Sequence, residues 1–154
     1  PLEDGDAEET DRGALRAVHT PGHTREHLSF HWPDACALFV GDLLLGEGDT
    51  TWVAEYPGCV ADYLRSLDLV DGLAADVLFP AHGPPLRDPV ADVERFRAHR
   101  LSRVEQARAA MAEHPNADIA ELVTAIYGPT LPSAMRRAAE ASLEAVLDHV
   151  RSQG

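Results

Sequence analysis

The 154-residue chain has few of the features that mark several protein classes. Its two cysteines, Cys36 and Cys59, lie far apart and form no CxxC pair, which excludes a disulfide framework. No apolar run approaches the roughly 18 residues that a membrane-spanning helix needs. The remaining composition, 45% hydrophobic and 25% charged, is that of an ordinary globular protein. We therefore expect a cytoplasmic protein with reduced thiols and no membrane partner.

Lysine is absent, and all 13 basic residues are arginine. Against them stand 26 acidic residues, and the net charge of −13 excludes a uniform attraction to nucleic acid or anionic membranes. Residues 87–108 are a local exception, with six arginines against four acidic residues. A basic helix face of this kind could hold RNA phosphates. The simpler interpretation is a solvated face with ion pairs within the helix.

Short apolar runs bounded by turn residues predict strands, and a helically spaced run predicts a helix. The strands are expected over residues 15–18, 28–32, 37–40 and 77–79, and the helix over residues 60–73. The acidic, turn-rich residues 1–13 are expected to form a surface loop.

After Pro84 the pattern becomes helical throughout. An apolar stripe over residues 93–111 predicts a long helix. Asp118, with Glu121 three residues later, resembles a capping box and predicts the start of a second helix. A third helix is expected from about Ser133.

Three polar side chains follow predicted strands, each beside a residue that lets the backbone turn sharply. His23 stands in the sequence TPGHT, Asp42 in GD and His82 in PAHG. Each alone is more typical of an ordinary turn. Together, at the ends of adjacent strands, two imidazoles and a carboxylate form a plausible set of ligands for zinc, iron or manganese.

The order of these motifs resembles the metallo-β-lactamase superfamily. The stretch GDLLLGEG, the segment DYLRSL and the helical tail are most similar to its β-lactamase-like protein 2 group. The resemblance implies an α+β fold in two parts. Residues 1–90 would form the C-terminal half of an αββα sandwich, and residues 91–154 a three-helix, winged-helix-like tail.

The resemblance also implies roles for the three polar residues. His23 would bind one metal ion, His82 a second, and Asp42 would bridge the two and position the nucleophilic water. Two zinc ions are expected, with iron or manganese as alternatives. The implied activity is hydrolysis of an ester, thioester, lactam or phosphodiester by metal-activated hydroxide.

The family's other ligands come from an HxHxDH motif, which this sequence lacks. We therefore expect the chain to be the C-terminal part of a longer hydrolase and to be inactive alone. Its first partner would be the N-terminal half of the same domain. A free chain would expose the sheet face that this half covers, so self-association is also expected.

Three further residues are candidates to support a ligand or to contact a small-molecule substrate: His27, Trp52 and Tyr56. Two other functions stay open at this point. One is an endoribonuclease that acts on single-stranded RNA, and the other is a non-catalytic binding module that uses the helical tail.

Overall fold

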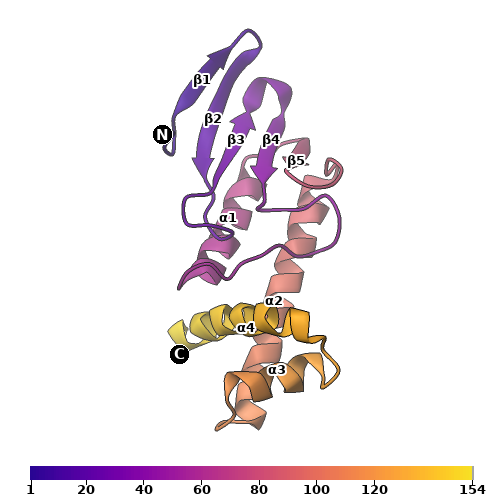
Figure 1. Cartoon of the computed structure of the whole chain (residues 1–154). Helices are drawn as coiled ribbons and strands as arrows, with labels where there is room; N and C mark the ends of the chain where they lie inside the picture. Colours follow the sequence, from indigo (N-terminus) through magenta and orange to yellow (C-terminus); the bar gives the residue numbers. More distant parts are fainter. Residues whose placement is uncertain (154) are drawn as a thin grey trace.

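A five-stranded mixed sheet forms the first part of the chain in the computed structural model, which describes residues 1–153 (Figure 1). The strands are β1 (Ala7–Thr10), β2 (Gly13–His19), β3 (Leu28–Trp32), β4 (Ala37–Gly41) and β5 (Val77–Pro80), paired in that order. The first four are antiparallel neighbours, and a short 3₁₀ turn, η1 (Pro33–Ala35), joins β3 to β4. β5 pairs parallel to β4, with helix α1 (Cys59–Gly72) in the connection.

The predicted α+β class is confirmed, and the four predicted strands and the first helix lie within two residues of their expected bounds. The prediction of a loop over residues 1–13 is wrong, because β1 lies within it. All four residues of β1 are exposed. A strand at the edge of a sheet with no buried face carries no alternating pattern, so the sequence offered no signal for it.

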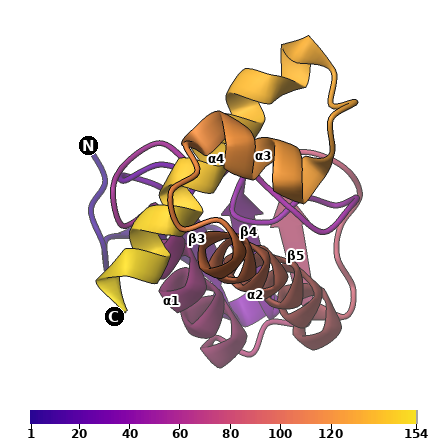
Figure 2. The same cartoon turned by 90° about the horizontal axis from the view of Figure 1, so that it is seen from below.

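The second part is helical: α2 (Pro89–Glu113), α3 (Ile119–Tyr127) and α4 (Ser133–Ser152). The capping box at the start of α3 is confirmed, because Asp118 and Glu121 each accept the other's backbone N–H. Residues 89–153 contain helices and turns but no strand, so this segment holds no wing of a winged helix. Seen from below, α3 and α4 lie beside α2 (Figure 2).

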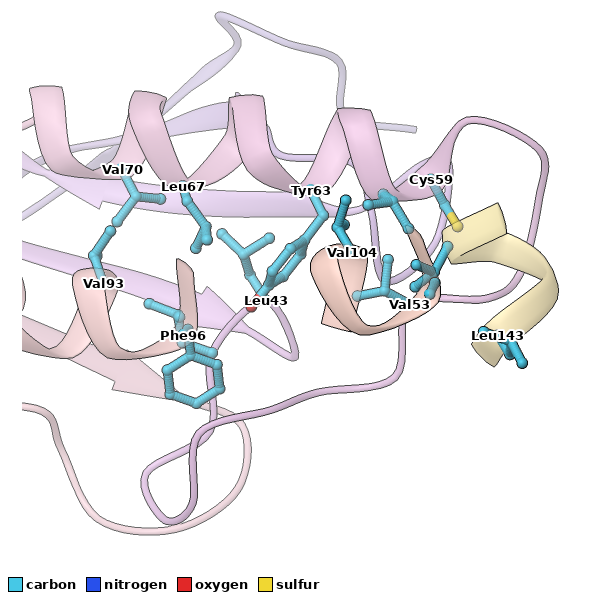
Figure 3. Packing of buried hydrophobic residues seen from close by; sticks show 14 of the residues in the cluster. Leu43, Val53, Cys59, Tyr63, Leu67, Val70, Val93, Phe96, Val104 and Leu143 are labelled. Carbon is cyan, nitrogen blue, oxygen red and sulfur yellow. The ribbon is translucent and has the colours of Figure 1, made fainter. Parts of the chain in front are cut away.

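One buried cluster connects both parts (Figure 3). Leu38, Val40 and Leu78 of the sheet are fully buried in it, with α1 and the first turns of α2. The same cluster continues along α2 into α3 and α4. The division at residue 90 stays a prediction, since α2 packs against elements on both sides of it.

The opposite sheet face carries a row of phenylalanines. The strand register pairs Phe30 with Phe39 and Phe39 with Phe79, so all three side chains point the same way. The rings of Phe39 and Phe79 stack with 5.2 Å between centroids, yet Phe39 is 38% exposed. Within residues 1–153 none of the three belongs to the buried cluster. This face is therefore apolar and only partly covered.

The two cysteines are free, with Cys36 exposed and Cys59 buried. No helix among residues 1–153 has both the length and the apolar character needed to cross a membrane.

Candidate metal centre

The topology brings three strand ends to one edge of the sheet. β2 and β4 both run antiparallel to β3, and β5 runs parallel to β4. The carboxyl ends of β2, β4 and β5 therefore meet, and His23, Asp42 and His82 follow these ends. The direction of these three strands therefore places the three side chains at one edge.

The three side chains converge as predicted. His23 Nε2 lies 4.0 Å from Asp42 Oδ2, and His82 Nε2 lies 3.5 Å from Asp42 Oδ1. Each imidazole therefore approaches a different oxygen of the same carboxylate. The His82 side chain is 76% exposed, against 25% for His23 and 34% for Asp42, so the site is open on the His82 side.

Backbone hydrogen bonds join the loops that carry Asp42 and His82. Ala81 N–H donates to Gly41 O and Gly46 N–H donates to His82 O, each at 2.8 Å. A Cβ on Gly46 would lie 2.2 Å from the backbone oxygen of Pro84, so only glycine allows the loops to approach this closely.

A hydrogen bond fixes the tautomer of His23. His23 Nδ1 lies 2.9 Å from the carbonyl oxygen of Trp52, which can only accept, so Nδ1 carries the proton. In a neutral imidazole Nε2 then presents a lone pair, and this is the atom that faces Asp42. A carbonyl bonded to the second ring nitrogen is the usual way in which a metal-binding histidine is oriented.

His27 supports Asp42 from behind. Asp42 N–H donates to His27 Nε2 at 3.2 Å, so the proton of the neutral ring is on Nδ1, which donates to Thr20 Oγ1 at 2.9 Å. The Thr20 hydroxyl also forms a hydrogen bond with Ser29 Oγ at 2.8 Å, and both Thr20 and Ser29 are fully buried. Burial, followed by the neighbouring His23, lowers the pKa of His27, which favours this neutral ring.

Gly41 makes room for that ring. It has a φ of +55°, and a Cβ built on it would lie 2.7 Å from His27 Nε2. Any other residue would combine a left-handed backbone with a clash, so Gly41 and His27 form one unit beneath Asp42.

Residues 1–82 match the family model described as the metallo-beta-lactamase superfamily. The chain belongs to the metallo-β-lactamase superfamily. This superfamily includes hydrolases, and its members usually bind metal ions. Over 99% of its length the chain is 31% identical to a beta-lactamase-like protein 2 homolog of Caenorhabditis elegans. It is also 31% identical, over 94% of its length, to an atrochrysone carboxyl ACP thioesterase of Aspergillus chevalieri.

Solved structures agree with this assignment. A metallo-beta-lactamase family protein from Thermus thermophilus aligns with the whole chain at 31% identity and a TM-score of 0.82. A beta-lactamase domain protein from Burkholderia ambifaria covers 99% of the chain at 28% identity and a TM-score of 0.89. The alignments cover 49% and 47% of those two chains. The chain likewise spans about half the length of the first curated relatives, 50% and 47%.

The donor set fits part of a metallo-β-lactamase centre. When the His23 ring is neutral with its proton on Nδ1, two acceptors face each other where His23 Nε2 meets Asp42 Oδ2, an arrangement that suits a cation. Within residues 1–153, however, no group of three or more His, Cys, Asp or Glu side chains could hold a metal ion by itself. These three side chains alone therefore form no complete metal site within the part of the chain that the structure describes.

Trp52 and Tyr56 lie in the loop that follows Asp42, and their side chains are engaged elsewhere. The indole N–H of Trp52 donates to Glu55, so its contribution to His23 comes from its backbone carbonyl. The Tyr56 hydroxyl donates to Asp62 at 2.9 Å, and Arg25 lies over its ring. Burial raises the pKa of Tyr56. Neither substrate contact is tested by this geometry, and both stay predictions.

Most arginines of α2 form ion pairs or are buried. Arg95, Arg97 and Arg108 each pair with an acidic residue three positions earlier, as the simpler interpretation expected. Arg97 also pairs with Asp68 of α1. Arg100 departs from the expected solvated face, because it is only 3% exposed.

Sequence reasoning missed the residues that hold the site in place. Thr20, Ser29, Thr51 and Arg100 form the hydrogen bonds around it, to residues between 7 and 49 positions away. One signal was readable: Arg100 occupies a position of the apolar stripe of α2, where a charged residue requires a reason.

Proposed function

We propose that this chain supplies three metal ligands of a binuclear, metal-dependent hydrolase. The observation that carries the proposal is the arrangement around Asp42, in which each carboxylate oxygen faces the Nε2 atom of a different histidine. A carboxylate placed in this way can lie between two cations. His23 and His82 would then bind one ion each, with zinc expected and iron or manganese as alternatives.

The chain's own residues orient this set. The Trp52 carbonyl keeps the proton of His23 on Nδ1, and His27 holds the backbone N–H of Asp42. Asp42 would contribute negative charge between the ions and help to fix the position of the attacking water. Bound metal would supply hydroxide at neutral pH and polarise the bond under attack.

Three ligands cannot complete two sites, since zinc in proteins usually has four ligands. We infer that the remaining ligands come from a partner segment that packs against the face bearing Phe30, Phe39 and Phe79. The N-terminal half of a metallo-β-lactamase domain is the segment of this kind that the family offers. This chain alone would then bind metal weakly and have little activity.

A thioester is the substrate class to test first. The relative from Aspergillus chevalieri is named a thioesterase and is 31% identical over 151 residues. Cleavage of single-stranded RNA receives less support, because four of the five α2 arginines are in ion pairs or buried, namely Arg95, Arg97, Arg100 and Arg108. Esters, lactams and phosphodiesters are the further substrates for comparison.

The test measures zinc binding to this chain and turnover of a generic thioester by the protein expressed from its complete coding sequence. Asp42→Ala should abolish both. Asp71→Ala is the matched control, since Asp71 is an exposed carboxylate of α1 away from the site. Zinc affinity and turnover that survive Asp42→Ala would refute the proposal and leave the binding-module hypothesis in its place.

A further inference from the structure

Arg100 is an unusual residue in the core of this molecule. It lies in the middle of α2, on the buried stripe between Phe96 and Val104, and is 3% exposed. Within residues 1–153 it forms no ion pair, and its Nε atom has no hydrogen-bond partner. Arginine is almost never buried in this way without a paired charge. A leucine or methionine would fill the position at less cost, so packing alone does not explain the arginine.

The contact that Arg100 does make leads to the candidate metal centre. Its Nη2 donates to the carbonyl oxygen of Thr51 at 3.0 Å, and the guanidinium lies 5.3 Å from the centre of the Tyr63 ring. Thr51 is 8% exposed, so this hydrogen bond is shielded from water. A charged donor in such surroundings holds a carbonyl more firmly than a neutral one.

Thr51 and Trp52 in turn touch two of the three candidate ligands. The Thr51 hydroxyl donates to the backbone oxygen of Asp42 at 2.8 Å. The next carbonyl along the chain, that of Trp52, accepts a hydrogen bond from His23 Nδ1–H. Thr51 and Trp52 therefore connect Arg100 to the two candidate ligands Asp42 and His23.

We propose that Arg100 is a positioning residue, which anchors the Thr51–Trp52 backbone and thereby holds His23 in one tautomer and Asp42 in its place. The proposal rests on the proposed function, because it concerns the same ligands. It assigns the tail helix α2 a part in the metal centre, although that helix supplies no ligand among the three.

The test compares Arg100→Met with the wild-type chain by two measurements. The first is the ¹⁵N spectrum of the His23 ring without metal, which distinguishes a single Nδ1–H tautomer from exchange between two. The second is zinc affinity, determined by competition with a chromophoric chelator. We expect Arg100→Met to show tautomer exchange at His23 and an affinity about tenfold lower, the scale of effect seen when the support of a ligand is removed.

Arg103→Met is the matched control. Arg103 lies on the same helix, stacks over Tyr127 and donates a hydrogen bond to Gln106, and among the described residues it makes no hydrogen bond to Thr51 or Trp52. It should retain the wild-type tautomer and affinity. Arg100→Lys keeps a charged donor and should restore the single tautomer, which a merely structural role of the arginine would not require.

Two outcomes would overturn the proposal. One is a folded Arg100→Met chain with a single His23 tautomer and zinc affinity within about twofold of wild type. The other needs no variant: exchange between two tautomers in the wild-type chain itself, which decides the matter even if Arg100→Met does not fold. If the wild type binds no zinc, the proposed function fails. Loss of the single tautomer in Arg100→Met would still support the anchoring role of Arg100.

Discussion

His23 and His82 face the same carboxylate from surroundings that differ sharply. His23 is three-quarters covered, and its second ring nitrogen is bound to the Trp52 carbonyl. The His82 side chain is 76% exposed, and its Nε2 atom lies 3.5 Å from Asp42 Oδ1. The backbone of His82 is held by a hydrogen bond, which Gly46 N–H donates to the His82 carbonyl oxygen. The side of the site near His23 is therefore preorganised, whereas the His82 side has an oriented backbone and a largely exposed ring.

Because of this difference, the two histidines can be used to distinguish a ligand that also stabilises the fold from one that only binds metal. A preorganised ligand also stabilises the fold, so its loss should affect both stability and metal binding. An exposed ligand contributes to binding alone. Variants along this edge of the sheet can therefore test whether the asymmetry is real.

The largest effect should come from Asp42, which both histidines approach. Asp42→Ala should lower zinc affinity more than about 100-fold, beyond the 10–100-fold typical of residues that only support a ligand. His27→Ala, which removes such a support, should fall within that range. Chelator competition on both variants gives the measurement. Equal losses would mean that Asp42 does not bridge the two sides.

Gly41→Ala should destabilise the His23 side next most strongly. The added methyl group would lie 2.7 Å from His27 Nε2 at a φ of +55°. We expect the free energy of unfolding to fall by about 1–3 kcal/mol, measured by urea denaturation. Gly72→Ala in α1 is the control, because its Cβ meets no atom within 4 Å. A Gly41→Ala variant as stable as this control would show that the His27 unit is not rigid.

The two histidines themselves give the direct comparison. His23→Ala breaks the bond to the Trp52 carbonyl and should lower the free energy of unfolding by about 1 kcal/mol. His82→Ala removes an exposed ring and should change it by less than about 0.5 kcal/mol. Both should weaken zinc binding. Thermal unfolding and zinc titration of each variant would reveal whether stability and binding separate in this way.

The smallest effect is expected at Trp52. Because His23 binds its backbone carbonyl, Trp52→Phe should leave zinc affinity within about twofold of wild type, as surface substitutions usually do. If the indole contacts substrate, the same variant should raise KM for the thioester without changing zinc affinity. A large loss of zinc affinity would contradict the role assigned to the backbone.

The sequence was sufficient to predict that the three candidate ligands lie close together, but not which residues support them. His23, Asp42 and His82 each follow an apolar strand, and strand direction then brings them together. Thr20 and Thr51 carry no such signal, since their partners are set by three-dimensional contact rather than by a periodic pattern. β1 escaped prediction for a related reason, because a strand with both faces in water has no hydrophobic alternation.

Helix α2 has a mechanical consequence for unfolding. Its 25 residues form a rod of about 38 Å at 1.5 Å per residue. Val93 and Phe96 near its start and Val104 and Ala107 farther along all belong to the one buried cluster, and α2 contacts α1 as well as α3 and α4. Because α2 packs with both parts, the sheet and the helical tail cannot unfold separately while α2 stays intact. Calorimetry should therefore record one cooperative unfolding transition.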